Sequence, residues 1–204
     1  MSNLMLYKLE ASSPASSVLV LADILNLKLK SKDLDYVNQE HKTPEYLKLN
    51  PLGTVPLLID GDFYLTDSHA MLTYLLSKYG GEHTERLYPS DVRTRALVDQ
   101  AMFFDTGVYF MQVKRVALPS LYDGMTSVPD NVKKDIEAAY SVVEAFLKNG
   151  LYLAGEQFTI ADISVGLTTA ALHYKTILEE WLLLPGEQLT DISVGLTILD
   201  ANNL

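Results

Sequence analysis

Two adjacent serines, Ser12 and Ser13, are the first residues of the chain that could do chemistry, and they lie in a small-residue turn that ends in Pro14. A hydroxyl at a turn between a strand and a helix can donate a hydrogen bond to an anion, and the positive end of the helix dipole stabilises the same charge. The chain has no cysteine, so any thiol that reacts here must come from another molecule. Taken alone, such a sequence is more typical of a simple turn or a helix cap.

A second candidate site begins at Asp67 and Ser68, which open a run with helical spacing. The free amides and the dipole at a helix start favour an anionic group, and the carboxylate of Asp67 could pair with an ammonium group. The alternative is that both residues only cap the helix. The four histidines, at positions 41, 69, 83 and 173, have no spacing typical of metal ligands, so we expect no metal site.

The composition disfavours several classes of protein. With 204 residues, of which 48% are hydrophobic and 21% charged, the chain is long enough for one large or two small folded domains. The formal net charge of −10 disfavours binding to nucleic acid or to an anionic membrane surface. The N-terminus lacks the pattern of a signal peptide, and no stretch approaches the ~18 apolar residues of a membrane span. We therefore expect a cytoplasmic protein that binds neither nucleic acid nor membranes.

The first half of the chain, residues 1–80, alternates between strand and helix patterns and ends at a Gly80-Gly81 helix stop. The turn dipeptide Asp60-Gly61 predicts a hairpin. The expected order is β-α-β-α-β-β-α, with strands at 4–9, 29–37, 55–59 and 63–65, and helices at 18–25, from 43, and at 67–79.

The second half has long helical patterns, so we expect it to be all-α. Thr159 and Asp162 have the spacing of a capping box, which we interpret as purely structural. Two apolar faces are predicted, one formed by Leu97, Ala101, Phe104, Val108 and Met111, the other by Val132, Ile136, Ala139, Val143 and Phe146.

This arrangement resembles a cytosolic glutathione transferase, in which a thioredoxin-like α/β domain is followed by an all-α helical domain. The segments Asn-Pro-Leu-Gly-Thr-Val-Pro at 50–56 and Thr-Asp-Ser-His-Ala at 66–70 look like the glutathione-binding signature of that family. The turn at 11–14 looks like the serine-type active site of the insect delta and epsilon classes. Residues 36–50, 67–69 and 103–107 are most similar to the epsilon class. The likeness covers about residues 4–170 and implies a glutathione-binding domain at 1–80, a linker at 81–90 and a helical domain at 91–204.

The resemblance implies roles for individual residues. Ser12 would keep the glutathione thiol ionised, with Ser13 as the runner-up. A cis Pro56 would let the backbone of Val55 pair with the cysteinyl residue of glutathione. The residues expected to bind glutathione are His41 at the glycyl end, Gly53, Thr54, Val55, Pro56, Asp67, Ser68, and His69 at the glutamyl end.

The chain also departs from the epsilon pattern. Gly53 stands where a histidine usually holds the glycyl carboxylate, so we expect weaker glutathione binding. Restoring the histidine is expected to tighten binding by up to ~1–3 kcal/mol. In addition, Ser13, Ala15 and Ser16 stand where similar enzymes commonly carry proline, a small residue or cysteine, and arginine.

A hydrophobic electrophile is the expected second substrate, in a site formed by Ser13, Val108, Met111, Gln112 and Arg115. Core packing is the alternative role for Val108 and Met111. The resemblance implies a homodimeric detoxification enzyme that conjugates glutathione, its co-substrate, to electrophiles without a metal. A non-catalytic glutathione- or ligand-binding protein, or a glutathione-dependent isomerase or peroxidase, are the alternatives.

The C-terminal residues 173–204 are unlike the family. Within them, residues 186–197 repeat 155–168 with two residues missing, and 11 of 12 positions match. We expect 186–204 to be either a weakly packed tail over the electrophile site or an inaccurately recorded stretch of sequence.

Overall fold

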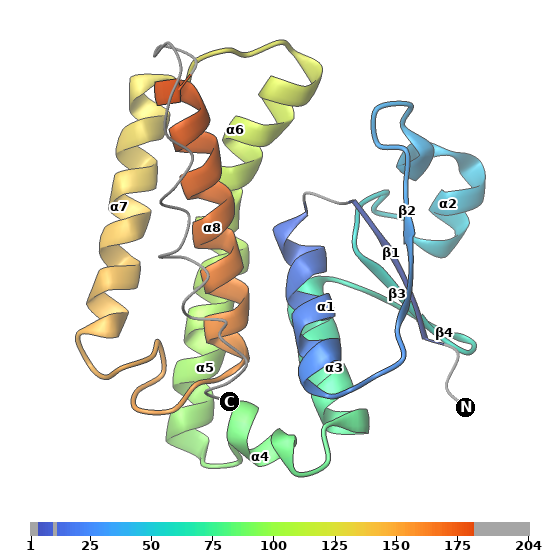
Figure 1. Ribbon diagram of the computed structural model, residues 1–204, viewed down its shortest axis with the longest axis vertical. Coiled ribbons are helices and arrows are strands. Elements are labelled where there is room, and N and C mark those ends of the chain that lie inside the picture. The colour runs from blue at the N-terminus through green and yellow to red at the C-terminus, as the bar shows by residue number, and fades with distance from the viewer. Residues whose placement is uncertain (1–3, 10–11, 182–204) are drawn as a thin grey trace.

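The computed structural model describes residues 4–9 and 12–181, with side chains up to residue 172. The expected tail at 186–204 therefore lies outside the described residues. A four-stranded mixed sheet with strand order β2-β1-β3-β4 forms one side of the molecule (Figure 1). β1 pairs in parallel with β2 and antiparallel with β3, and β3 pairs antiparallel with β4. The strands are β1 (Leu4–Lys8), β2 (Lys30–Asp33), β3 (Leu57–Asp60) and β4 (Phe63–Thr66).

Successive residues of β3 point to opposite faces of the sheet, and this alternation explains how both faces are covered. Leu58 packs into the main core with α1 (Ser13–Ile24) and α3 (Ser68–Tyr79). Leu57 packs with Leu34 and Tyr46 in a smaller core beneath α2 (Pro44–Leu49) and the 3₁₀ turn η1 (Glu40–Lys42). Figure 1 shows α1 and α3 between the sheet and the helical half, with α2 on the opposite side.

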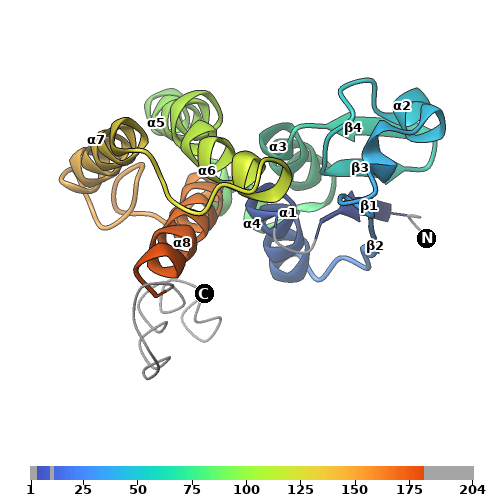
Figure 2. The ribbon, with the colours of Figure 1, turned by 90° about the horizontal axis from the view of Figure 1, so that it is seen from above.

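In the helical half, α8 is the helix that packs against α1, as the view from above shows (Figure 2). Its buried apolar residues continue the main core, so the two halves share one hydrophobic interior. Its elements are α4 (His83–Leu87), α5 (Val92–Phe104), the π-helical turn η2 (Asp105–Tyr109), α6 (Phe110–Tyr122), α7 (Asp130–Leu147) and α8 (Ile160–Trp181).

The apolar face predicted to run continuously through α5 and α6 is wrong at both of its ends. Ala101 is buried, but Leu97 at the first end and Val108 and Met111 at the second are exposed. The five-residue π turn between the two helices adds a residue to one turn of helix and shifts the face that α6 presents to the core. The side chains buried on α6 are Gln112, Val113 and Val116.

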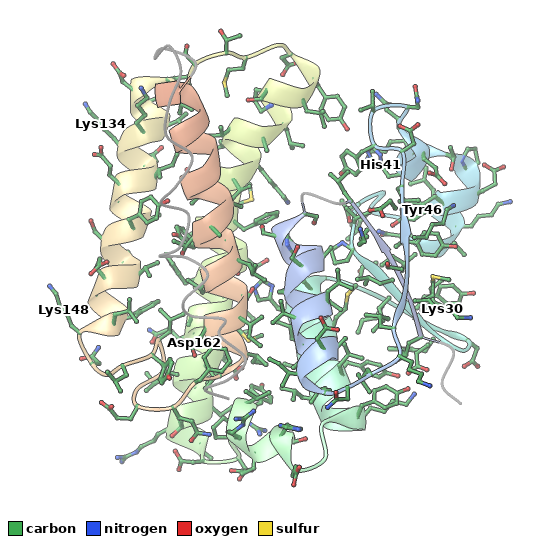
Figure 3. The ribbon with its side chains drawn as sticks, in the orientation of Figure 1. Lys30, His41, Tyr46, Lys134, Lys148 and Asp162 are labelled. Atoms are coloured by element: carbon green, nitrogen blue, oxygen red, sulfur yellow. The ribbon has the colours of Figure 1, made fainter. Side chains whose placement is uncertain are left out.

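The capping box before α8 is confirmed. The Asp162 carboxylate accepts hydrogen bonds from the Thr159 amide at 2.8 Å, the Thr159 hydroxyl at 3.0 Å and the Leu153 amide at 2.9 Å. Burial raises the pKa of Asp162, although these donors oppose the shift. Asp162 thus ties the preceding loop to the lower end of α8, where Figure 3 labels it. None of the helices in the described part of the chain combines the length and apolar character that a membrane span requires.

Candidate functional site

The register of the sheet brings three separate segments to one edge. Tyr7 of β1 is opposite Leu57 of β3, and Leu57 is opposite Thr66 of β4. The turn that carries Ser12 follows β1, the Val55-Pro56 dipeptide directly precedes Leu57, and Asp67 directly follows Thr66. The fold therefore gathers the turn at 12–14, the loop at 53–56 and the start of α3 at one end of the strands.

Ser12 is the N-cap of α1. Its Oγ accepts a hydrogen bond from the Ala15 amide at 3.3 Å, so the hydroxyl proton is left to donate elsewhere. Ser12 is half-buried, and the first turn of α1 holds no acidic residue that would oppose a bound anion. The hydroxyl of the alternative, Ser13, is buried and has no hydrogen-bond partner among the described residues. Of the two serines, Ser12 is the better placed to meet a ligand.

The loop before β3 has its carbonyl groups held by side chains from η1 and α2. The Val55-Pro56 peptide is cis, as the resemblance implies. The Thr54 carbonyl accepts hydrogen bonds from the Tyr46 hydroxyl and from Asn50 Nδ2, both at 2.7 Å. Burial raises the pKa of Tyr46 to about 12, so the hydroxyl remains a donor throughout the physiological range. These contacts fix the backbone of Val55 at the edge of the site.

Tyr46 was not predicted from the sequence, and Asn50 was included only as part of the 50–56 signature, without a role of its own. Tyr46 lies on α2 and Asn50 caps its C-terminus, and only the packing of α2 against the loop reveals what they hold. The helical start Thr43-Pro44, which brings Tyr46 into place, was the signal available in the sequence.

Asp67 occupies the N-cap position of α3 with a positive φ of 72°. Its Oδ1 accepts a hydrogen bond from the Ala70 amide at 3.0 Å, while about half of its side chain remains exposed. The neighbouring His69 ring and the Ala70 amide lower the pKa of Asp67, although burial opposes them, so the carboxylate is ionised at neutral pH. Ser68 is buried at the first position of the helix. The start of α3 thus offers a carboxylate and helix-end amides side by side.

His69 links this helix start to the helical half. Its Nε2 lies 3.1 Å from Asp105 Oδ2 and 3.0 Å from Ser164 Oγ, and the Ser164 hydroxyl donates to the same Asp105 oxygen at 2.6 Å. Its Nδ1 is 3.7 Å from Asp67 Oδ1. Burial alone would lower the pKa of His69, but the hydrogen bond to Asp105 and the proximity of Asp67 outweigh it and raise the pKa to about 9. The ring is engaged with these protein groups, and its direct contact with the glutamyl end of glutathione stays a prediction.

His41 is placed differently from what its expected role requires. The imidazole is only 3% exposed and stacks against the Tyr36 ring, with centroids 3.7 Å apart and planes 4° apart. Burial, and then the charge of Lys42, lower the pKa of His41, so the ring is neutral. Its Nδ1 is buried without a hydrogen-bond partner in the described part of the structure. Figure 3 shows His41 beside α2, on the side of the sheet away from the helical half.

Gly53 has a positive φ of 56°, a conformation that side chains other than glycine adopt at a cost. A Cβ atom here would lie 2.9 Å from the His41 carbonyl oxygen and 3.0 Å from both Lys42 Nζ and Leu47 Cδ2. This crowding opposes the expected tightening of glutathione binding by a histidine restored at position 53, because the loop would have to shift to accept the side chain; the expectation itself stays a prediction.

The residues expected to form the electrophile site do not all face the same way. Val108 and Met111 are 47% and 42% exposed, so core packing does not account for them. Gln112 is buried, with its amide bonded to the Val108 carbonyl. Arg115 donates to Gln112 Oε1 at 3.0 Å and to Asp135 of α7 at 2.5 Å. The guanidinium is thus engaged within the helical half.

A contact between the two halves was missed by the sequence analysis. The Tyr122 hydroxyl, at the end of α6, donates to the Tyr36 carbonyl at 3.4 Å, and the two rings lie 6.5 Å apart. Tyr36 also covers His41, so an aromatic bridge joins the helical half to the loop before η1. Within residues 4–9 and 12–172, we find no cluster of side chains that could hold a metal ion.

Comparisons with known proteins agree with this architecture. Residues 6–83 match the family model of the glutathione S-transferase N-terminal domain, and residues 98–185 match that of the C-terminal domain. A glutathione S-transferase 1 from Manduca sexta is 39% identical over 159 residues, which cover 78% of this chain and 72% of that protein.

Two solved structures are similar along most of the chain. An epsilon-class glutathione S-transferase from the housefly, Musca domestica, is 35% identical with a TM-score of 0.79, covering 90% of this chain and 89% of its own. A glutathione transferase homolog from Drosophila mojavensis, solved with bound glutathione, is 37% identical with a TM-score of 0.77, covering 97% of this chain and 94% of its own. With both family models matched in order, the strand topology of the N-terminal half and the helical C-terminal half, this chain belongs to the glutathione transferase family, of the insect delta and epsilon type.

Proposed function

We propose that Ser12 is the catalytic residue of this glutathione transferase and that it stabilises the thiolate of glutathione. The Ser12 oxygen already accepts the Ala15 amide, so the hydroxyl proton is available to point at the sulfur. The amides at the start of α1 add a positive partial charge in the same direction. This free donor at a helix N-terminus is the observation that carries the proposal.

The reaction requires little other chemistry from the protein. The bound thiol loses its proton to solvent, the thiolate attacks the electrophile, and a new carbon–sulfur bond forms as the leaving group departs or the double bond accepts the electron pair. The barrier falls because a thiol that titrates near ~8.5 in water is held as its more nucleophilic thiolate at neutral pH. Ser12 is thus proposed to lower the pKa of the thiol rather than to act as a base.

The remaining contacts with glutathione follow the edge of the sheet. The backbone of Val55 would pair with the cysteinyl residue, as a peptide adds to an exposed strand. Asp67 would bind the γ-glutamyl ammonium group, and the helix start with Ser68 would bind its α-carboxylate. The half-exposed Asp67 carboxylate and the fixed carbonyl of Thr54 support this placement.

The second substrate is proposed to be a small hydrophobic electrophile. Its site would lie against η2 and the start of α6, where Val108 and Met111 expose apolar side chains. Arg115 supplies no free charge to this site, because it is bonded to Asp135, so recognition here depends on apolar contact. We also propose a homodimer and a cytoplasmic location, as the resemblance to the cytosolic enzymes implies.

The decisive experiment compares Ser12→Ala with Ser13→Ala. In the wild type, the pKa of bound glutathione, measured from thiolate absorbance, is expected below ~8.5, and Ser12→Ala should raise it and lower conjugation of an aryl halide by about 10- to 1000-fold. Glutathione affinity should change little, since the hydroxyl acts on the sulfur. Asp67→Ala should do the opposite and weaken affinity without moving the thiol pKa.

The outcomes separate the alternatives. If Ser13→Ala rather than Ser12→Ala raised the thiol pKa, the catalytic role would pass to Ser13. A wild type that binds glutathione but conjugates no electrophile would be a non-catalytic binding protein. Urea unfolding serves as the control, since loss of the α1 cap alone should cost about 1 kcal/mol of stability.

A further inference from the structure

We propose that Asn149, in the turn after α7, is a site of spontaneous deamidation, and that its isoaspartyl product strains the turn that leads to the cap of α8. The reaction uses only the chain and water. Figure 3 shows the neighbouring Lys148 at the lower end of α7, whereas α1, which Ser12 caps, begins at its upper end (Figure 1). The modification is therefore separate from the proposed glutathione site and does not depend on the proposed function.

The reaction starts at the backbone nitrogen of Gly150, the residue that follows Asn149. The amide loses its proton to hydroxide, and the nitrogen attacks Cγ of Asn149. A nitrogen–carbon bond forms, the bond from Cγ to Nδ2 breaks, and Nδ2 leaves as ammonia. Water then opens the cyclic imide at either of its carbonyl carbons. One opening gives aspartate, and the other gives isoaspartate, in which the main chain runs through the former side chain.

The structure leaves the attacking amide free. The Gly150 N–H donates no hydrogen bond to any residue that the structure describes. Asn149 is exposed and lies beyond Leu147, the last residue of α7, so the helix does not hold its backbone. One long hydrogen bond, from Asn149 Nδ2 to the Ala145 carbonyl at 3.4 Å, holds its side chain. Because glycine has no Cβ, no side chain shields the nitrogen from Cγ.

The other asparagines in the described part of the chain precede a nitrogen that is engaged or has no proton. Asn50 is buried, and the next residue is Pro51, which has no N–H. Three exposed asparagines precede an amide that donates to a carbonyl: Asn26 before Leu27, 2.8 Å from Ala22; Asn38 before Gln39, 3.2 Å from Tyr36; and Asn131 before Val132, 2.9 Å from Pro129. Among the described asparagines, Asn149 alone combines exposure with a free amide after it.

Packing of the turn requires the glycine that makes Asn149 reactive. A Cβ atom on Gly150 would lie 2.7 Å from Gly155 Cα and closer still to the Gly155 carbonyl group, and real Cβ atoms do not approach other atoms so closely. The two glycine backbones can meet only because position 150 has no side chain. A residue that would shield the amide therefore cannot occupy this position without moving the turn.

Isoaspartate would disturb this turn. It lengthens the main chain by one carbon directly before the contact with Gly155. From there the turn continues through the bridge in which the Tyr152 and Gly155 amides donate to each other's carbonyls, at 2.8 and 3.1 Å. The next residue, Leu153, donates its amide to Asp162 at 2.9 Å. Strain at position 149 therefore acts on the loop that the cap of α8 holds.

The first measurement follows the chemistry in the folded protein. The full chain is incubated at mildly alkaline pH and digested in acid, and its peptides are analysed by mass spectrometry. Isoaspartate is detected by enzymatic methylation. The Asn149 peptide should deamidate about 10-fold faster than the Asn26 and Asn131 peptides and should contain isoaspartate. An unmodified Asn149, or equal rates at the three positions, would overturn the proposal.

The second measurement is urea unfolding of fresh wild type, aged wild type, aged Asn149→Gln and fresh Asn149→Asp. The longer side chain of glutamine disfavours the cyclic imide, and aspartate supplies the new charge, which the dipole of α7 opposes, without lengthening the main chain. Aged wild type should unfold at a lower urea concentration than Asn149→Asp, and aged Asn149→Gln should match the fresh wild type. If aged wild type unfolded like Asn149→Asp, isoaspartate would not strain the turn. An equal loss in aged Asn149→Gln would place the damage elsewhere, and either result would overturn the proposal.

Discussion

Ser12 and Asp67 each have a structural role and, in the proposed function, a role in ligand binding as well. Each is the N-cap of a helix, and each gives one oxygen to a backbone amide of its own helix. Capping leaves Ser12 with a hydroxyl proton and Asp67 with a second carboxylate oxygen. In the proposed function, this proton and this oxygen contact the ligand. Substitution of Ser12 or Asp67 should therefore affect both stability and function.

Gly53 provides a prediction at the scale of one residue, with Gly61 as its matched control. Both have a positive φ, 56° and 66°, but a Cβ would meet nothing within 4 Å at Gly61, while at Gly53 it would lie 2.9 Å from a carbonyl oxygen. Gly61→Ala should therefore cost about 1 kcal/mol of stability from backbone strain alone, and Gly53→Ala about 1 kcal/mol more. Urea unfolding of the two variants measures the difference.

A second prediction for Gly53 concerns glutathione affinity. Gly53→His should bind glutathione no better than the wild type, because a Cβ at this position crowds the His41 carbonyl oxygen and strains the loop beside the proposed site. A tighter-binding Gly53→His with unchanged stability would show that the loop relaxes to accept the side chain, contrary to the crowding described here.

The candidate residues were predictable only where a local pattern carries their chemistry. The Val-Pro dipeptide, the serine turn and the Asp-Ser helix start are contiguous motifs, so the resemblance could point to them. Lys42, Tyr46 and Asn50 matter through contacts with a loop 4 to 11 residues away along the chain, which depend on how α2 packs. The burial of His41 under Tyr36 is likewise a tertiary contact, and nothing in the neighbouring sequence indicates it.

At the scale of elements, the order of strands and helices in the first half follows from hydrophobic spacing and turn residues, but some bounds do not. The strand predicted at 29–37 is only β2 (Lys30–Asp33), whose residues are all exposed, and the helix predicted at 18–25 begins at Ser13. The hairpin at Asp60-Gly61 and the helix that ends at Tyr79 are confirmed. The π turn between α5 and α6 could not be predicted from the sequence. A π turn of five residues contains one residue more than a turn of α-helix, and so short an insertion leaves no distinct hydrophobic pattern. Val108, within the turn, and Met111, just after it, were therefore assigned to the wrong face, whereas Val132, Ile136, Ala139 and Val143 on α7 are buried as predicted.

The buried cap of α8 predicts a large effect on stability. Asp162 accepts three hydrogen bonds from groups that would be left without a partner in the interior. Asp162→Ala should lower the free energy of unfolding by about 3 kcal/mol. Asp91→Ala, which removes the exposed cap of α5 and its two hydrogen bonds to Thr94, should cost about 1 kcal/mol. Similar losses in the two variants, measured by urea unfolding, would contradict a special role for the buried cap.

His69 connects three elements, α3, the π turn and α8, and it makes their association depend on pH. Its pKa is about 9 in the folded protein and near ~6.5 in an unfolded chain. The protonated ring therefore stabilises the fold fully below pH ~6.5 and still mostly at pH 7, and this stabilisation is lost as the pH rises through 9.

The measurement is urea unfolding at pH 7 and pH 9.5, for the wild type and for His69→Gln. The wild type should lose about 2 kcal/mol more than the variant between the two values, since only the wild type carries the titrating ring. Parallel losses in both proteins would mean that other groups cause the pH dependence and that Asp105 and Ser164 do not hold a charged imidazole.

For the whole molecule, the division into a thioredoxin-like half and a helical half follows from the sequence, whereas the way the halves join does not. The patterns predict helices in both halves but not that α1 and α8 pack against each other. The partly buried triad of His69, Asp105 and Ser164 crosses this boundary, as does the bridge between Tyr36 and Tyr122. The candidate site lies where the halves meet, so its details depend on contacts that local sequence does not encode.

We predict that the surface formed by α3 and α5 is the interface of the proposed homodimer. Here a pocket of about 420 Å³ is lined by residues of both helices, and Phe103, 73% exposed, lies at its edge. An exposed phenylalanine beside a pocket is typical of a surface that packs against another protein. In an interface with twofold symmetry, the same patch on a second copy can cover both the ring and the pocket.

Phe103→Glu should therefore weaken the dimer by at least 10-fold, because it places a charge where an apolar ring would be buried. The control is Leu151→Glu, which changes a comparably exposed apolar residue, 76% exposed, in the loop after α7. Sedimentation equilibrium of the wild type and of Leu151→Glu should give twice the 22.7 kDa mass of one chain, while Phe103→Glu should shift toward the single-chain mass. A monomeric wild type, or equal dissociation in both variants, would mean that this surface does not form a dimer interface. Because Asp67 and His69 also line the pocket, a dimer formed through it would lie directly beside the proposed γ-glutamyl site, and Phe103→Glu should weaken glutathione binding as the subunits separate.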